Sequence, residues 1–339
     1  MTDIERRLPI RLVLVTESRA REDADPSRHS RDLDMTTPEQ AEWISESLKD
    51  VVSEVITFTD LAEFAKQADS LRNSVVWPHW NGSRNRNRTA QAAMVCEIFG
   101  LRYVGPDPYG RLIANDKSLS KIFLRQAGLD TPSSVFVGTT QQISLIETLR
   151  LPLIVKPNME GSSIGIDKKS ASTTHEGAKL IARDKLEEFS EGVIVEEFIS
   201  GPEVFIALAF KKDGDYSCGT AERIVQDNPY FLHNDVYDYA LKFSGARQVS
   251  LRPSSFLTRE LLSKILYLTD VLKTVDLIRI DGRLLDGKMS IIEITPDPLM
   301  TPDSEFLGSL ELSGHPRKKI LRDIIERVSA RTPGQWSNS

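Results

Sequence analysis

The stretch from Leu151 to Ile166, LPLIVKPNMEGSSIGI, limits the fold and the chemistry of this chain more than any other. A short apolar strand over 151–155 leads into Lys156, a loop of small residues follows, and a second strand is expected from Ile164. A lysine that leaves a buried strand beside a Gly/Ser loop with free N–H groups predicts an anion site, most often for phosphate. The loop is not a Walker A motif, because the lysine precedes it. The alternative is a β-hairpin with a Gly-Ser turn and an exposed lysine.

Length and charge limit the class of protein. The chain has 339 residues and a net charge of −6, and this length suits roughly two or three domains. The charge argues against nucleic acid as a partner, and the longest basic cluster, Arg84, Arg86 and Arg88, is expected to be a solvated loop. No run approaches the ~20 apolar residues of a membrane span. We therefore expect small-molecule substrates and neither nucleic acid nor a membrane as a partner.

The cysteines and the start of the chain bear on its location. Cys96 and Cys218 lie far apart without metal-binding spacing, which indicates a reducing compartment and two buried, small apolar side chains. The opening residues, MTDIERRLPIRLVLVT, contain too short an apolar run for a signal peptide and are expected to form a first strand. Both features predict a cytoplasmic protein.

Strands and helices alternate over the first hundred residues. Thr37, Pro38 and Gln40 have the pattern of a capped helix start, after a long polar loop over 17–35. Strands are predicted at 9–16, 51–58, 74–77 and 102–104, and further helices at 60–68 and 89–99. This order predicts a parallel sheet with helices on its faces.

The remainder is predicted to be α+β and mostly antiparallel. Helices are expected at 117–127, 174–189, 258–274 and 317–329, a strand at 193–198, and a hairpin of strands 277–285 and 289–294. The Asp286-Gly287 pair that joins the hairpin favours a type I′ turn. We predict an N-terminal parallel α/β domain over 1–114, a central subdomain over 115–207, a C-terminal subdomain over 208–332 and a flexible tail over 333–339.

The hairpin carries a second chemical pattern. Arg279 and Asp281 alternate on one face of a strand, and Asp281 is expected to lie across from Glu293 on the partner strand. Two carboxylates on adjacent strands offer oxygen ligands to a hard cation such as Mg²⁺. The alternative is a cross-strand pair of Arg279 with a carboxylate at the surface.

Five segments in order resemble the D-alanine–D-alanine ligases of the ATP-grasp superfamily: KPNMEGSSIGI, VEEFISGPEV, VYDYALKF, IRID and IIEITPDPLMT. The resemblance implies an ATP-grasp fold, in which an N-terminal parallel α/β domain is joined to two α+β subdomains that clasp ATP. It implies an ATP-dependent ligase that joins a carboxylate to an amine through an acyl phosphate and releases ADP and phosphate. Mg²⁺ is the implied metal, and dimers are common in this family.

The resemblance also assigns roles to single residues. The implied ATP-binding residues are Lys117, Lys156, Gly161, Ser162, Ser163, Glu196, Glu197, Phe198, Ile199, Glu203 and Lys242. The implied metal ligands are Asp281, Glu293 and Thr295. The implied catalytic residues are Arg279, Ser162 and Lys242, of which Arg279 would face the developing oxyanion.

Three departures from the family pattern affect the metal and the reacting groups. Thr295 stands where the family has Asn, and a hydroxyl is a weaker metal ligand than an amide carbonyl, although Asp297 nearby could compensate. Leu299 stands where the family has a Gly that donates its N–H to the oxyanion. Phe243 replaces a tyrosine that follows the phosphate-binding lysine.

Other departures affect the substrates. The Gly-Gly…Glu stretch that grips the first amino acid is absent, and Glu17 is either a displaced analogue or a loop acid. His79 either lines the substrate site or is a surface histidine beside Trp80. Ser304 aligns with the residue that takes the carboxylate of the acceptor, but its neighbour is Glu305 instead of an apolar residue.

The ATP motifs are therefore retained while the substrate motifs are rebuilt. This contrast predicts a ligase that joins amino acids or a small peptide other than two D-alanines. Two alternatives stay open, namely a D-alanine–D-alanine ligase proper and a homologue that binds nucleotide without catalysis.

Overall fold

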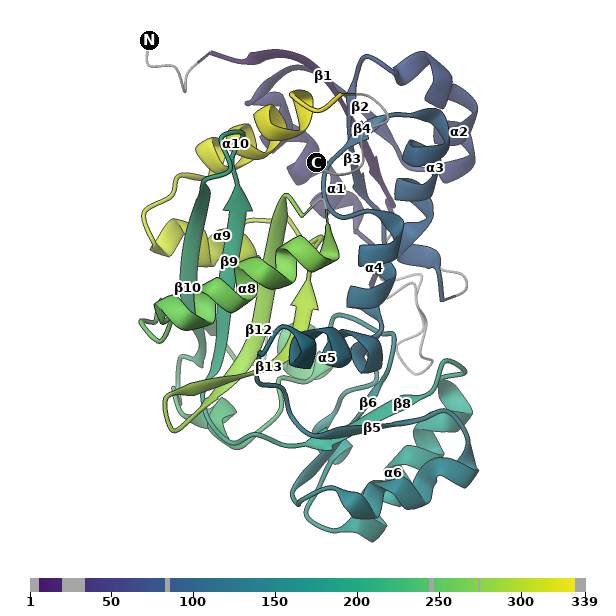
Figure 1. The fold of residues 1–339 in the computed structure, drawn as a ribbon, viewed down its shortest axis with the longest axis vertical. Coiled ribbons are helices and arrows are strands. Elements are labelled where there is room, and N and C mark those ends of the chain that lie inside the picture. The colour runs from purple at the N-terminus through teal and green to yellow at the C-terminus, as the bar shows by residue number, and fades with distance from the viewer. Residues whose placement is uncertain (1–5, 20–33, 83–85, 244–246, 274, 333–339) are drawn as a thin grey trace.

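The computed structural model describes residues 6–19, 34–82, 86–243, 247–273 and 275–332. Within these residues the chain forms three sheets, shown in Figure 1. Their strand orders are β2-β1-β3-β4, β5-β8-β6-β7 and β11-β10-β9-β12-β13. The first sheet belongs to the N-terminal part of the chain, and all three sheets contribute residues to the candidate site.

The N-terminal sheet is parallel, as predicted. It consists of β1 (Leu8–Thr16), β2 (Val52–Phe58), β3 (Val75–His79) and β4 (Arg102–Tyr103), with the helices α1 (Pro38–Lys49), α2 (Leu61–Gln67) and α3 (Gln91–Phe99). The predicted capping box of Thr37 and Gln40 starts α1. Thr16 pairs with His79 at the carboxyl ends of β1 and β3, the edge where parallel sheets usually hold ligands. Most of the predicted loop over 17–35 lies outside the described residues.

The small central sheet is antiparallel. It contains β5 (Ser134–Val137), β6 (Leu153–Pro157), β7 (Ala171–Ser172) and β8 (Val193–Glu197), and α6 (His175–Glu188) packs on it. The prediction of a strand from Ile164 is wrong, because consecutive turns occupy this segment. The Ile164 N–H donates to Gly161 O at 2.9 Å, and Ser162 and Ser163 have φ values of 50° and 60°.

The large sheet is antiparallel and contains the hairpin. Its strands are β9 (Glu203–Phe210), β10 (Tyr216–Val225), β11 (Val249–Pro253), β12 (Leu277–Leu285) and β13 (Lys288–Thr295). Asp286 and Gly287 have φ values of 52° and 75°, as the predicted type I′ turn requires. The predicted limit at residue 207 falls inside β9, and the domain limits remain predictions.

Helices cover both faces of the large sheet (Figure 1). α5 (Lys117–Gln126) and α8 (Arg259–Leu272) pack on one face, while α9 (Glu305–Leu312) and α10 (Arg317–Ser329) join the other face to the N-terminal sheet in one core. α4 (Pro108–Asn115) and α7 (Tyr239–Phe243) complete the helices. The sequence analysis missed α4 and α9, although Asp107 and Ser304 cap them.

The burial of Arg88 and of the two cysteines bears on smaller expectations. Arg88 is fully buried and donates to Met159 O at 2.8 Å and to Glu160 at 2.9 Å, so the prediction of a solvated loop is wrong at this residue. Cys96 is buried as predicted, whereas Cys218 is only partly buried, and both are free. In the described part of the chain, no helix combines the length and apolar character needed to cross a membrane.

Candidate active site

Two adjoining cavities lie where the three sheets meet. The first cavity is lined by every residue that the resemblance assigns to ATP, and also by Arg279, Asp281 and Glu293. The second cavity lies toward the N-terminal sheet and includes His79, Thr295 and Ser304 in its wall. The residues common to both walls are Gly161, Ser162, Tyr237, Lys242, Arg279, Glu293 and Glu305.

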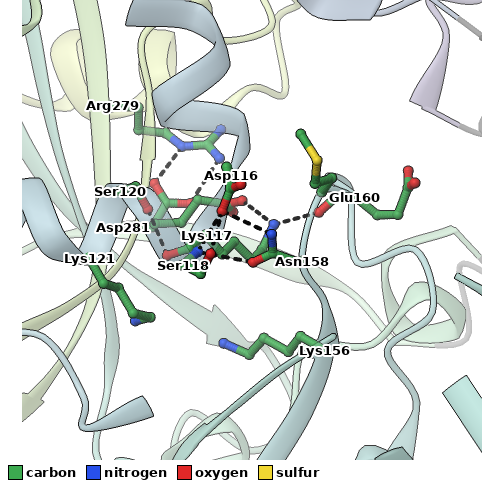
Figure 2. Close-up of polar contacts among 12 residues, drawn as sticks. Asp116, Lys117, Ser118, Ser120, Lys121, Lys156, Asn158, Glu160, Arg279 and Asp281 are labelled. Atoms are coloured by element: carbon green, nitrogen blue, oxygen red, sulfur yellow. Dashed lines mark hydrogen bonds and ion pairs between the residues drawn. The ribbon is translucent and has the colours of Figure 1, made fainter. Parts of the chain in front are cut away.

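Lys117 is fixed at the start of α5. Asp116 caps the helix by accepting from the N–H groups of Ser118 and Leu119, each at 3.0 Å, and from the amide of Asn158 at 2.9 Å. From this position Lys117 Nζ donates to Glu160 O at 2.5 Å, as Figure 2 shows. It also pairs with Glu293 at 2.8 Å. The Asp116 cap of α5 and the Glu293 carboxylate on β13 thus hold Lys117 in the wall of the first cavity.

Lys156 belongs to a buried group of three charges. Lys156 on β6 and Lys121 on α5 both pair with Glu196 on β8, the latter at 2.8 Å. Burial alone would raise the pKa of Glu196, but the two lysines lower it to about 2. The sequence analysis missed Lys121, although its position four residues after Lys117 puts both on one helix face. Glu196 is therefore an anchor for two cations in this structure.

The hairpin places the two predicted metal ligands as expected. Asp281 and Glu293 are direct cross-strand partners. Arg279 Nε and Nη2 donate to the two oxygens of Asp281 at 2.7 and 2.8 Å, as Figure 2 shows. Asp281 is only 6% exposed, so the alternative of a surface pair is wrong. Burial raises the pKa of Asp281 to about 6, although Arg279 acts in the opposite direction.

Arg279 is also one member of a row of alternating charges. Its Nη1 donates to Glu305 at 2.9 Å, and Arg223 pairs with both Glu305 and Glu203. The guanidinium of Arg223 lies 3.8 Å from the ring centroid of Tyr237. The row thus links Glu203, one of the predicted ATP-binding residues, with Asp281, a predicted metal ligand. Sequence reasoning missed Arg223, because its partners come from other strands and a helix.

The second cavity contains a buried histidine. His79 is 3% exposed, with Nδ1 3.7 Å from Asp297, so the alternative of a surface histidine is wrong. Asp297 pairs with Arg111 at 2.6 Å and lines only the second cavity. Thr295 lies opposite Arg279 and lines the second cavity. Neither residue lines the first cavity, where Asp281 and Glu293 lie.

Glu17 lies behind this wall without lining the cavity. One carboxylate oxygen accepts from the Gly82 N–H, and within the described residues the other has no partner. The side chain is buried, and burial raises its pKa to about 7. Ser304 is buried as well, and its hydroxyl accepts from the Leu307 N–H at 3.3 Å at the start of α9.

The donor set suits Mg²⁺ in chemistry and number. Within the described ranges, no three His, Cys, Asp or Glu side chains gather in an arrangement that could hold a metal ion without further ligands. Asp281 and Glu293 supply oxygen donors from two sides, and Mg²⁺ commonly takes one or two carboxylates and keeps waters and phosphate oxygens. Leu299 has no positive φ, so its N–H is presented by ordinary backbone. The side chain of Phe243 lies outside the described residues.

Comparisons with known proteins agree with this geometry. The family model described as "D-ala D-ala ligase C-terminus" matches residues 125–326. A D-alanine–D-alanine ligase of Coprothermobacter proteolyticus is 28% identical over 278 residues, which are 79% of this chain and 86% of the relative. One from Azobacteroides pseudotrichonymphae is 30% identical over 224 residues, covering 64% of this chain and 66% of its own.

Solved structures give the same fold. The D-alanine–D-alanine ligase of Bacillus anthracis complexed with ATP superposes with a TM-score of 0.65 at 21% identity, over 95% of this chain and 97% of that chain. VanG D-Ala:D-Ser ligase of Enterococcus faecalis gives 0.66 at 17% identity, over 95% and 100%.

The fold and the paired cavities define an ATP-grasp enzyme. The chain belongs to the D-alanine–D-alanine ligase family. This membership confirms the predicted class of activity, an ATP-dependent ligase that forms C–N bonds with ATP and Mg²⁺ and acts on small amino-acid substrates. The roles of single residues remain predictions.

Proposed function

We propose that this chain activates a carboxylate substrate with ATP in the first cavity and joins it to an amine from the second, and that its substrates are not two D-alanines. The observation that carries this proposal is the shared wall, in which Ser162, Lys242 and Arg279 face both cavities. A phosphorylated carboxylate formed at this wall would meet the amine without leaving the protein.

The proposed nucleotide contacts follow the charges of the first cavity. ATP carries about four negative charges, which cations must neutralise before a carboxylate can approach the γ-phosphorus. Lys117, Lys156 and Lys242 supply that charge from three different elements. The N–H groups of the loop over 161–163 contribute further donors, and Glu203 is proposed for the ribose.

Asp281 and Glu293 would hold Mg²⁺, with Thr295 as a weaker third ligand. When bound, the ion neutralises phosphate charge and orients the phosphate oxygens. Arg279 already bonds Asp281, so the metal and the guanidinium would share this carboxylate. The remaining donor hydrogens of Arg279 would then stabilise negative charge on the acyl oxygen, an interaction that strengthens in the transition state.

The proposed reaction has two steps. An oxygen of the donor carboxylate attacks the γ-phosphorus, the bond to the β–γ bridging oxygen breaks, and ADP leaves. The amine nitrogen then attacks the acyl carbon, and the C–O bond to phosphate breaks. The ammonium loses two protons in forming the amide, of which one remains on the phosphate and one is released.

The substrate side motivates the altered specificity. The relatives are named for D-alanine, whereas Glu305 brings a carboxylate into the shared wall of this chain. His79, which lines the second cavity, is proposed to face the ammonium of the donor, and Glu17, buried behind it with one oxygen unpartnered within the described residues, is proposed to supply the negative charge. Ser304 is proposed on the acceptor side.

Location and assembly are part of the same proposal. Two free cysteines suit the cytoplasm, and family resemblance suggests a homodimer. Light scattering on purified protein tests the homodimer, and a mass of one chain would overturn it.

The decisive assay is ADP release with ATP and Mg²⁺ against a panel of D- and L-amino acids, dipeptides and amines. We expect turnover with a donor–acceptor pair other than two D-alanines. Robust turnover with D-alanine alone would overturn the altered specificity. Nucleotide binding by calorimetry without ADP release on any substrate would instead favour a non-catalytic homologue.

A further inference from the structure

The carboxylate of Glu305 lies between two guanidinium groups. One oxygen accepts from Arg279 Nη1 at 2.9 Å, and the other accepts from Arg223 Nη2. Glu305 is the first residue of α9, where the helix dipole also favours negative charge. Two arginines that converge at a helix start make a strong carboxylate-binding arrangement. In this chain, one of its own side chains fills that arrangement.

This filled arrangement lies where the two substrates must meet. Glu305 and Arg279 line both cavities, and Ser304 lines the second. The Ser304 hydroxyl already accepts from the Leu307 N–H. An acceptor approaching the shared wall therefore meets a carboxylate that is already neutralised, and not a pair of available arginines.

The other charges of the second cavity lead to the same conclusion. Its described arginines are Arg111 and Arg279, and each is bonded to a carboxylate. By contrast, the carboxylates of Asp34 and Asp303 on its wall make no hydrogen bond or ion pair with any described residue. Lys242, the lysine in this wall, is proposed for the phosphates of ATP. A substrate carboxylate brought into such a cavity would therefore be desolvated beside other acids and without an arginine that lacks a carboxylate partner, at substantial cost.

We propose that the acceptor is an amine with no free carboxylate beside its amino group, such as an alkylamine, a diamine or an amino-acid amide. Glu305 determines this specificity by occupying the place that the carboxylate of an amino-acid acceptor would take. The inference rests on the proposed ligase function and specifies the class of its second substrate.

Glu305→Ala is expected to reverse the selectivity. Without the Glu305 carboxylate, Arg223 keeps Glu203 and Arg279 keeps Asp281, so neither buried guanidinium loses its last partner and the fold should persist. The N–H groups of Arg223 and Arg279 that now donate to Glu305 would become available to an incoming carboxylate. Glu305→Gln keeps the volume of the side chain without its charge and serves as a second variant if Glu305→Ala unfolds.

The test compares acceptors that differ only in the carboxylate, namely alanine, alaninamide and ethylamine, with a fixed donor, ATP and Mg²⁺. For the unaltered chain we expect kcat/KM for alaninamide or ethylamine to exceed that for alanine by at least about 10-fold, since one charge-assisted contact is worth roughly that factor. In Glu305→Ala this ratio should fall by at least about 10-fold. Glu311→Ala, which removes an acid on the same helix that pairs with Arg317, should leave the ratio unchanged.

Two results would overturn the inference while leaving the ligase function intact. One is equal or better use of alanine by the unaltered chain, and the other is an unchanged ratio in both folded Glu305 variants. Absence of ADP release with every acceptor would overturn the proposed function itself and this inference with it. Thermal unfolding and ATP calorimetry on each variant show that the comparison is made on folded, nucleotide-binding protein.

Discussion

Asp281 lies directly opposite Glu293 in the β12–β13 hairpin, yet each carboxylate is bound by a different cation. Arg279 binds Asp281 through two nitrogens, and Lys117 binds Glu293 at 2.8 Å. Each of the two carboxylates proposed for Mg²⁺ is thus neutralised by its own cation, which reduces the repulsion between them, and both cations also line the first cavity. Metal binding must therefore compete with, or share, both of these contacts.

Asp281→Asn is expected to lower Mg²⁺-dependent ADP release by at least about 100-fold, since a neutral amide is a poorer ligand and leaves the phosphate charge less neutralised. The fold should survive, because Arg279 retains Glu305. Turnover across a Mg²⁺ titration and thermal unfolding are the two measurements. A collapse of thermal stability together with activity would identify Asp281 as a structural residue.

Lys156→Ala is expected to weaken ATP binding by about 100-fold, since a charge-assisted contact contributes roughly 2–3 kcal/mol. Glu196 keeps Lys121 as a partner, so the loss should appear in affinity more than in stability. Calorimetric titration with ATP measures the change. Lys66→Ala, at an exposed pair with Glu63, is the matched control, and equal affinity in the two variants would contradict the role of Lys156.

Thr295→Asn is expected to reduce the Mg²⁺ concentration for half-maximal turnover by about 3- to 10-fold, because an amide carbonyl is a better ligand than a hydroxyl. Thr295 lies two residues after Glu293 on β13, so both side chains share one face of the strand. ADP release across a Mg²⁺ titration measures this change. An unaltered half-saturation point would argue that residue 295 does not reach the metal.

Glu17→Gln is expected to change the free energy of unfolding in a way that depends on pH. The pKa of Glu17 is raised from 4.5 to about 7 by burial, so between these values the folded chain binds more protons than the unfolded chain. Stability contributed by protonated Glu17 is thus fully present below about pH 4.5 and is lost as pH rises through about 7. The Gln variant should be more stable than the unaltered chain at pH 8, by up to about 3 kcal/mol, and the difference should disappear near pH 4.5.

Denaturant unfolding at several pH values checks this expectation, with the exposed Glu63→Gln as control. If Glu17 also takes the donor ammonium, the same variant should raise KM for the donor despite its higher stability. A pH-independent difference would show that Glu17 is not buried in its protonated form.

Gly219→Ala is expected to disturb α9 and with it the position of Glu305. A Cβ at residue 219 would lie 2.3 Å from the backbone oxygen of Ser309, and overpacking of this kind costs about 1–3 kcal/mol. Gly308→Ala on the same helix would meet only a side-chain carbon of Leu251 at 2.7 Å, which can rotate away. Urea unfolding should therefore show a larger loss for Gly219→Ala, and equal losses would contradict the close approach.

Local sequence patterns were sufficient to predict much of the fold. The alternation of strands and helices predicted the parallel sheet, Asp286-Gly287 predicted the hairpin, and the period of two along strands predicted that Asp281 faces Glu293. Each of these depends on residues close in sequence or joined by one tight turn. The order of the ATP-binding motifs along the chain then indicated the family and, through it, the ATP-grasp fold.

Charge pairing across the chain could not be predicted in this way. Arg88 is buried because Glu160, 72 residues later, meets it, and Arg223 meets Glu305 over a separation of 82 residues. A charged side chain is rarely buried unless the fold supplies a partner of opposite charge. The residues next to it in sequence do not show which distant residue that partner is. The strand expected from Ile164 was wrong because turns continue past the predicted loop: Ser162 and Ser163 adopt the left-handed backbone that glycine adopts most readily, and the N–H groups of Ile164 and Ile166 donate back into the loop.

The bridge between Arg223 and Glu305 has a consequence for how sequences of this kind can diverge. Arg223 is fixed by aromatic rings and by Glu203 as well as by Glu305, so losing Glu305 alone would leave the Arg223 cation in place in the wall of the first cavity. Losing Arg223 alone would leave Glu203 without its partner. We therefore expect position 305 to change among homologues while Arg223 and Glu203 stay together, so that one substitution at the start of α9 is enough to switch the second substrate.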